Sequence, residues 1–202
     1  MTSSHYFSSK PSSKDERAII ETVLRGRRVS FYTSRGVFSA KRVDNGTRVL
    51  VENMVIPERG EFLDLGCGVG IVGIMAALES PALRVHLSDI NPRAVMLTRL
   101  NVQRHGLENC RVYEGSLYEP LGDKVFDVIA SNPPVSAGMH NVVYPMVSGA
   151  FDHLNDGGVL QMVIQSNKGG KMLAGFFNEV FGGHEVLAKK SGYRVFSAVK
   201  RI

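Results

Sequence analysis

The chain has 202 residues, of which 44% are hydrophobic and 21% are charged, and its formal net charge is +5. This length suits one continuous apolar core, and the composition excludes a largely disordered or disulfide-rich chain. No apolar run reaches the roughly 18 residues that a membrane span needs, and the N-terminus has no apolar signal core. We therefore expect a soluble, cytoplasmic protein of one domain.

The basic residues and the cysteines narrow the possible partners. Short basic clusters favour contact with a polyanion such as nucleic acid, although they are also typical of solvated surface. The clusters are Arg25/Arg27/Arg28, Lys41/Arg42, Lys189/Lys190 and Lys200/Arg201. The two cysteines, Cys67 and Cys110, lack the Cys/His spacing of zinc sites. We expect reduced thiols and no metal.

The N-terminal region predicts a leader and an extension. Residues 1–13 are serine-rich and are expected to form a disordered leader, and residues 14–60 are expected to pack on the core as a helix and a hairpin. The helix is predicted to begin at a capping box and to end before Gly26, and its apolar face is Ile19, Ile20, Val23 and Leu24. The hairpin is predicted from two β-prone runs, 28–33 and 37–40, around a turn at 34–36.

From residue 61 to residue 202, apolar strands alternate with helical segments. This alternation predicts an α/β fold with a mainly parallel sheet covered on both faces. Strands are predicted at 61–65, 84–88, 110–114, 125–131, 159–165, 184–190 and 193–199. Asn91 and Pro92 are typical of a helix start, and two later helices have apolar stripes. The last two strands are too close together for an intervening helix, so we expect an antiparallel pair.

A glycine-rich turn between a strand and a helix is the strongest local signal. It runs from Asp64 to Gly70 and contains Gly66, Cys67 and Gly68. Glycines permit a tight turn and close approach to a ligand, and the following helix offers free N–H groups, so a nucleotide-like ligand is expected here. Asp64 would repel a pyrophosphate but attract an ammonium group, which indicates a ligand that carries a cation.

The next two strands end in further polar residues. Asp89, in the run Ser88-Asp89-Ile90-Asn91, is placed to accept both hydroxyls of a ribose, because Asn91 already serves as the helix cap. Ser116 and Leu117 follow the third strand and are placed to contact an adenine edge, although Gly-Ser is also ordinary turn chemistry. All these positions belong to one edge of a parallel sheet.

The fourth strand runs directly into Asn132, Pro133 and Pro134. Isolated, such a tripeptide is usually a rigid turn, because proline fixes φ and restricts the preceding residue. At the end of a buried strand on the glycine-loop edge, it instead presents an amide and stiff carbonyls to the reactive end of the ligand. We therefore predict that these residues are catalytic.

The motifs Asp64–Gly70, Asp89, Ser131–Pro134 and Gly36–Ser39 resemble those of class I methyltransferases of the small-domain family. The similarity runs from about residue 20 to the C-terminus and is strongest to the catalytic domain of ribosomal RNA guanine-N2 methyltransferases, especially single-domain archaeal relatives. The resemblance implies a Rossmann-like sheet of seven strands with an antiparallel last strand. It implies S-adenosylmethionine as cofactor, RNA as partner, and a cofactor site that includes Phe38, Ile90, Asn91 and Asn132.

The chain departs from those relatives in two ways. They tend to carry an aromatic residue after the prolines, where this chain has Val135, and they have an additional N-terminal domain that we expect this chain to lack. Without that aromatic residue, a flipped base would have to stack elsewhere. The candidates are Phe31, Tyr32, Phe38 and Tyr193.

The favoured hypothesis is methyl transfer to an exocyclic amino group of an RNA base, most simply guanine N2 in ribosomal RNA. The Asn132 side-chain oxygen and the Pro133 carbonyl would accept its two hydrogens, and the proton would leave to water, because no base lies close in sequence. Alternative acceptors are adenine N6, guanine in transfer RNA and a protein glutamine amide. Two alternative protein classes are an NAD-dependent oxidoreductase, because Gly68–Gly73 fits the glycine pattern of such enzymes, and an inactive RNA-binding scaffold.

Overall fold

The computed structural model describes residues 17–34, 37 and 42–201. The predicted leader and Phe38 lie outside these residues. Within them, the central sheet has seven strands in the order β5-β4-β3-β6-β7-β9-β8. They are β3 (Arg59–Leu65), β4 (Ala82–Asp89), β5 (Cys110–Glu114), β6 (Phe126–Ser131), β7 (Leu154–Gln165), β8 (Glu185–Lys190) and β9 (Tyr193–Val199). All seven lie where the sequence predicts strands.

The sheet is parallel except for its last strand. The pairs β3/β4, β3/β6, β4/β5 and β6/β7 are parallel, whereas β9 inserts between β7 and β8 and runs antiparallel to both. The sequence therefore predicted the fold class, the seven-stranded sheet and the terminal antiparallel pair correctly. The parallel strands β3, β4, β5 and β6 all end at one edge of the sheet.

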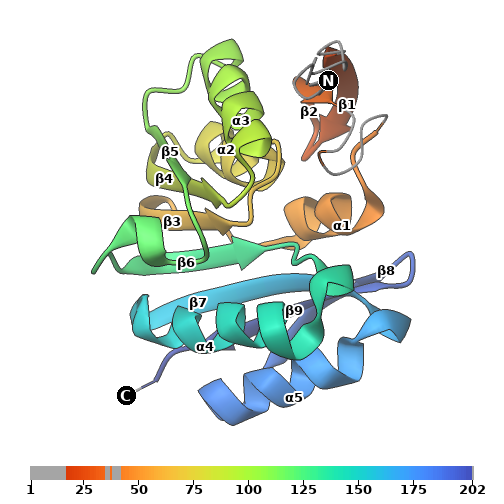
Figure 1. Cartoon of the computed structure of the whole chain (residues 1–202), viewed down its shortest axis with the longest axis vertical. Coiled ribbons are helices and arrows are strands. Elements are labelled where there is room, and N and C mark those ends of the chain that lie inside the picture. Colours follow the sequence, from red (N-terminus) through yellow and green to blue (C-terminus); the bar gives the residue numbers. More distant parts are fainter. Residues whose placement is uncertain (1–16, 35–36, 38–41, 202) are drawn as a thin grey trace, which may run out of the picture.

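In the described part of the chain, five α-helices cover the two faces of the sheet (Figure 1). They are α1 (Asn45–Asn53), α2 (Ile71–Glu79), α3 (Pro92–Arg104), α4 (Tyr144–Asp152) and α5 (Gly170–Phe181). Helices α1, α2 and α3 pack on one face and α4 and α5 on the other. Short helical turns η1 (Glu119–Leu121), η2 (Val135–Ala137) and η4 (Ser166–Lys168) and a π-helix, η3 (Met139–Val143), lie in the connections.

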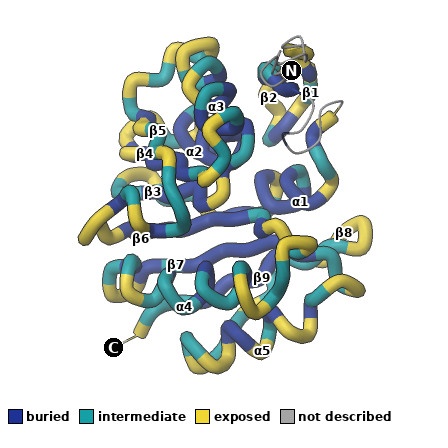
Figure 2. The backbone as a smooth tube through the Cα atoms, viewed as in Figure 1, coloured by how far each residue is buried: buried dark blue, intermediate teal, exposed yellow. Residues whose placement is uncertain are grey.

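Neighbouring residues of each central strand face different cores, as the two-residue period of a strand requires. Phe62 packs in the core beneath α1, α2 and α3, while Leu63 packs in the core beneath α4 and α5. Figure 2 shows β6 and β7 as buried along much of their length. Among the described residues, no helix combines the length and apolarity needed to cross a bilayer.

The N-terminal extension differs from its prediction. The segment predicted as a helix is strand β1 (Arg17–Leu24), which pairs antiparallel with β2 (Arg27–Ser34). The hairpin therefore lies one strand earlier than predicted, with its turn at Arg25 and Gly26, while the predicted turn at 34–36 falls mostly outside the described residues. Both residues of the observed turn have positive φ, 47° and 74°, as a two-residue type I′ turn requires. A glycine that ends a helix also takes positive φ, which explains the error.

Helix α1 was not predicted. It begins after Asp44, whose carboxylate accepts a hydrogen bond from the Thr47 N–H at 3.1 Å, and it buries Val49, Leu50 and Val51. Asp44 is thus a side-chain N-cap of the preferred type. The helix packs on β7, β8 and β9 and against α2, which brings its first turn to the edge where β6 ends.

Asn101 of α3 makes a buried connection between the hairpin and the rest of the molecule. The Asn101 Oδ1 accepts from the Tyr32 N–H at 2.7 Å, and its Nδ2 donates to the carbonyls of Tyr32 at 3.0 Å and Val69 at 2.9 Å. The Asn101 side chain is completely buried. One amide therefore bridges the hairpin and the glycine-rich loop.

Candidate active site

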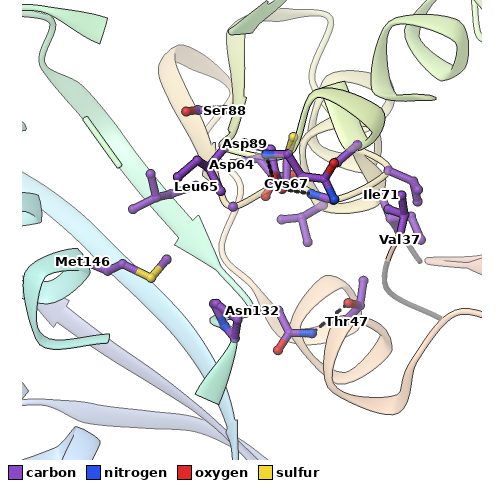
Figure 3. A pocket seen from close by; sticks show the side chains of 18 of the residues that line it. Val37, Thr47, Asp64, Leu65, Cys67, Ile71, Ser88, Asp89, Asn132 and Met146 are labelled. Carbon is purple, nitrogen blue, oxygen red and sulfur yellow. Dashed lines mark hydrogen bonds between the residues drawn. The ribbon is translucent and has the colours of Figure 1, made fainter. Parts of the chain in front are cut away.

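A cavity of about 460 Å³ lies at the carboxyl ends of β3, β4, β5 and β6, which is a size typical of small-molecule sites. Ligands of open α/β sheets bind at this edge, where the strand order reverses. Eleven predicted site residues line it: Asp64, Gly66, Cys67, Gly68, Asp89, Ile90, Asn91, Ser116, Leu117, Asn132 and Pro134. Gly70 and Pro133 do not, although both adjoin residues that do. Figure 3 shows labelled members of the lining.

The glycine-rich loop leaves space for a ligand at two of its glycines. Gly66 and Gly68 have φ of 72° and 58°, and a Cβ added at Gly68 would meet no atom within 4 Å. The N–H groups of Gly66 and Cys67 donate to the Ser88 carbonyl, which fixes the turn. Gly70 serves packing instead, because a Cβ there would lie 2.9 Å from the Thr98 Cγ2. The loop thus forms a cradle for a group that needs close backbone contact.

Asp64 is a buried carboxyl in the cavity wall. Its side chain is 1% exposed, and Oδ2 accepts a hydrogen bond from the Gly73 N–H at 2.8 Å. Burial raises the pKa of Asp64 to about 7, partly opposed by this hydrogen bond. A cationic group beside it would favour its ionised form, so the residue fits a ligand that carries an ammonium.

Asp89 already accepts two backbone hydrogen bonds. Its Oδ2 accepts from the Gly68 N–H and its Oδ1 from the Asn91 N–H, both at 2.8 Å. Each carboxylate oxygen retains a lone pair, so Asp89 can still accept two hydroxyls. Asn91 is the side-chain cap of α3, as predicted, through a hydrogen bond from the Arg93 N–H.

The loop after β5 forms part of the cavity wall through Ser116 and Leu117. Leu117 has a φ of 48°, which is uncommon for a residue with a side chain, and its carbonyl accepts from the Ser88 hydroxyl at 3.4 Å. Ile90, which is 68% exposed, lines the cavity at the end of β4. These residues offer an apolar and backbone-polar surface of the kind that suits a planar heterocycle.

Asn132 has the most specific hydrogen bonding of the site. Its Nδ2 donates to the two carboxylate oxygens of Asp44, at 3.2 and 3.4 Å, and to the Thr47 Oγ1 at 3.0 Å. Figure 3 shows the Thr47 and Asn132 side chains pointing toward each other. An ionised carboxylate only accepts hydrogen bonds, so the amide nitrogen must face α1. No described residue donates to the Asn132 Oδ1.

The backbone around Asn132 is held on both sides. The Ser131 hydroxyl donates to the Leu65 carbonyl at 2.7 Å, which joins the ends of β6 and β3. The Pro133 carbonyl accepts from the Val135 N–H at 2.9 Å and keeps one lone pair for another donor. The tripeptide is therefore a rigid element, and its Asn132 Oδ1 and Pro133 carbonyl can still accept hydrogen bonds from a ligand.

The sequence analysis missed the contribution of α1. Asp44 and Thr47 line the cavity but lie 88 and 85 residues before Asn132. The available signal was Asp at an N-cap position before an apolar run, which predicts a helix start but not its neighbour. Sequence also could not identify the residues of the π-helix that line the cavity, Asn141 and Val142.

Three of the predicted stacking residues are not in the cavity wall. Phe31 is fully buried in the core, and the Tyr32 ring packs under the Arg104 guanidinium at 4.8 Å. Tyr193 is half-buried beside Gly46. The fourth, Phe38, lies outside the described residues. Near Asn132 the lining is instead Pro134, Ala137, Val142 and Met146.

Thiol chemistry does not suit this cavity. Cys67 and Cys110 are buried and free, and burial raises the pKa of both thiols, that of Cys110 to about 12. A protonated thiol is a poor nucleophile. Within the described ranges, no group of three or more His, Cys, Asp or Glu side chains could hold a metal ion.

Comparison with solved structures places the fold. The T. Thermophilus 16S rRNA N2 G1207 methyltransferase (RsmC), in complex with AdoMet and guanosine, matches 96% of this chain and 53% of its own with a TM-score of 0.83 and 24% identity. A methyltransferase from Pyrococcus furiosus matches 76% of this chain and 81% of its own with a TM-score of 0.63 and 20% identity. At these identities the likeness establishes the Rossmann-like methyltransferase fold.

The family assignment rests on relatives that are similar in sequence. Uncharacterized protein YbxB of Bacillus subtilis is 35% identical over 98% of this chain and 99% of its own length. Ribosomal RNA small subunit methyltransferase C of Erwinia tasmaniensis is 33% identical over 83% of this chain but 48% of its own length. The chain thus spans about half the length of the latter. The family model for the methyltransferase small domain matches residues 28–197. The chain therefore belongs to the methyltransferase small domain family, a family of S-adenosylmethionine-dependent methyltransferases.

Proposed function

We propose that this protein transfers a methyl group from S-adenosylmethionine to an exocyclic amino group of an RNA base, with guanine N2 in ribosomal RNA as the favoured acceptor. The observation that carries the proposal is the Asn132 Oδ1 beside the cavity, to which no described residue donates. A hydrogen-bond acceptor at this position favours a substrate group that donates a hydrogen bond, such as an amino group. The names of the relatives, ribosomal RNA small subunit methyltransferase C and a 16S rRNA N2 G1207 methyltransferase, support the choice of base.

The proposed cofactor contacts follow from the chemistry of the lining. Asp64 would pair with the amino-acid ammonium, Asp89 would accept the ribose hydroxyls, and Gly66 and Gly68 would admit close backbone contact. Ser116 and Leu117 would flank the adenine. S-adenosylmethionine supplies an activated methyl group when bound. The cytoplasm, where ribosomal RNA is available, is the expected site of the reaction.

The substrate contacts are two acceptors at fixed positions. The Asn132 Oδ1 and the Pro133 carbonyl would each accept one hydrogen of the amino group, so that the nitrogen lone pair is free to react. Holding the nitrogen this way contributes to the rate through orientation. The departing proton passes to water in this proposal, and the buried thiols do not serve as bases.

The test is transfer of isotope-labelled methyl to unmodified ribosomal RNA, transfer RNA, DNA and protein, followed by mass spectrometry of the products. Label in N2-methylguanosine of ribosomal RNA is the expected result. Label in N6-methyladenosine, in transfer RNA or in a protein glutamine would move the substrate and overturn the proposed base or partner. Absence of label in every acceptor would overturn the proposed activity.

Asn132→Ala tests the role of the amide. We expect kcat to fall by about 100-fold or more, because a misplaced amino group loses alignment. Cofactor affinity, measured by calorimetry, should change less than about threefold. A loss of cofactor binding as large as the loss of kcat would contradict the assignment of Asn132 to the substrate.

A further inference from the structure

Two residues at the start of α1, Asp44 and Thr47, contact the side-chain amide of Asn132. A side-chain amide can turn by 180° and exchange its oxygen for its nitrogen at little steric cost. At the end of β6 this exchange would replace an acceptor by a donor toward the substrate. The function proposed above therefore requires something that holds the amide in one of its two orientations.

Asp44 distinguishes the two orientations, whereas the Thr47 hydroxyl, which can donate or accept, adds a hydrogen bond to the amide. The Asp44 carboxylate offers only acceptors, and both of its oxygens lie within 3.4 Å of the Asn132 Nδ2. The Thr47 Oγ1 lies 3.0 Å from the same nitrogen. If the amide turned, its oxygen would face two carboxylate oxygens, which is unfavourable in a half-buried site.

The local packing keeps these groups together. The Thr47 N–H holds the Asp44 Oδ1 at 3.1 Å through the helix cap. A Cβ added at Gly46 would lie 3.0 Å from the Asp44 Oδ1, 3.0 Å from the Tyr193 Cε1 and 3.3 Å from the Asn132 Nδ2. A Cβ here would require these neighbours to move by a few tenths of an ångström, so glycine favours the close approach of α1, β9 and the end of β6.

We propose that Asp44 is a positioning residue that turns the Asn132 Oδ1 toward the substrate, that Thr47 supports this orientation, and that the orientation restricts the methyl acceptor to groups that donate hydrogen bonds. The inference rests on the proposed function, since it specifies how the same amide selects an amino group. Asp44 serves at once as the cap of α1 and as the electrostatic partner of Asn132.

The first test is the double variant D44N/T47V. Asparagine is as good an N-cap as aspartate, so α1 should remain folded. With its oxygen held by the backbone N–H of residue 47, the amide introduced at position 44 would place its NH2 against that of Asn132, which favours the turned amide. We expect kcat to fall by about tenfold, within the coupling range of contacting residues, with an unchanged cofactor Kd. The single variant T47V should lose part of the wild-type kcat, whereas T47S, which keeps the hydroxyl, should retain most of it.

Thr33→Val is the matched control for Thr47→Val. The Thr33 side chain is fully buried, and its hydroxyl has no hydrogen-bond partner among the described residues. Both substitutions replace a buried hydroxyl by a methyl group, but Thr33→Val breaks no hydrogen bond. Its kcat should therefore stay at the wild-type value. A fall like that of T47V would show that loss of any buried hydroxyl suffices and would overturn the inference.

Exchanging the carboxylate and the amide between positions 44 and 132 tests the direction of their hydrogen bond separately from general structural damage. N132D brings two carboxylates together and should be nearly inactive at neutral pH. In N132D/D44N, the amide introduced at position 44 can donate to the new carboxylate at position 132, whose other oxygen remains an acceptor toward the substrate. We expect kcat to recover at least about fivefold over N132D, at the coupling scale of contacting residues. No recovery, with both variants folded, would overturn the inference.

Two further readouts keep this test separate from that of the proposed function. In the N132A background, D44N/T47V should cause no additional loss of kcat, and an equal additional loss would overturn the inference. By NMR, the Asn132 side-chain amide protons, assigned by their absence in N132A, should exchange slowly in the wild type and at least about tenfold faster in D44N/T47V. If wild-type protein transfers no methyl group, the proposed function fails, while the NMR result still decides the amide orientation.

Discussion

At the scale of single residues, the carboxyl of Asp64 connects cofactor binding to pH. Its pKa is raised from 3.8 to about 7 by burial. The folded protein therefore holds this proton more tightly than the unfolded chain, so ionisation opposes folding. This unfavourable contribution appears as pH rises from about 4 to about 7 and reaches its full size above that range.

A bound ammonium would reverse the preference of Asp64 for its proton. We expect cofactor affinity to rise by about fivefold between pH 6 and pH 7, with release of a proton on binding, because the carboxyl must ionise to pair with the cation. Calorimetry in two buffers of different ionisation enthalpy measures the proton release. Asp64→Asn should bind more weakly and lose both effects. Proton uptake by the wild-type protein would contradict this role.

Residue-scale prediction from sequence succeeded where a side chain follows a strand. Asp64, Asp89 and Asn132 could be placed at one edge because parallel strands end together, and all three line the cavity. Asp44 and Thr47 could not be placed, because their approach to Asn132 depends on how α1 packs across β7 and β9. No spacing in the sequence encodes that contact.

At the scale of elements, two helical glycines have opposite surroundings. A Cβ at Gly73 in α2 would lie 2.7 Å from the Leu87 Cδ2 and 3.1 Å from the Asp64 Cβ, whereas one at Gly175 in α5 would meet nothing within 4 Å. Helix α2 can lie this close to β4 only because Gly73 has no side chain. Alanine has the higher helix propensity at both positions.

We therefore expect Gly73→Ala and Gly175→Ala to change stability in opposite directions. Gly175→Ala should raise the free energy of unfolding by about 0.5–1 kcal/mol. Gly73→Ala should lower it by about 1–3 kcal/mol, because the crowded atoms belong to a packed core. Urea denaturation of both variants gives the comparison. Equal stabilisation by both would mean that α2 shifts without cost and would contradict the packing argument.

Element prediction succeeded in the core and failed in the extension for physical reasons. The strands β3 to β7 are apolar runs separated by helices, a pattern with few alternatives. In β1, Ile20 and Leu24 face the core while Ile19 and Val23 are about half exposed. This spacing also fits a helical face, and only pairing with β2 decides between the two.

At the scale of the whole molecule, the site draws on distant parts of one chain. The cavity is lined by residues from Val37 to Met146, and it lies where β3 stands between β4 and β6. The fold class and this location were predictable, because a sheet of this order binds ligands where its strand order reverses. The placement of the hairpin was not, because it depends on contacts with residues distant in the chain, among them the buried amide of Asn101.

That amide, Asn101, makes the hairpin and the glycine-rich loop one cooperative unit. Tyr32 cannot expose its N–H without releasing the side chain that also holds the Val69 carbonyl. A ligand that restrains the loop should therefore slow hydrogen–deuterium exchange in β1 and β2, although neither strand lines the cavity. Asn101→Ala should abolish this protection while the loop itself remains protected. In the wild-type protein, hydrogen exchange in the hairpin would therefore report cofactor binding in a cavity that the hairpin strands do not line.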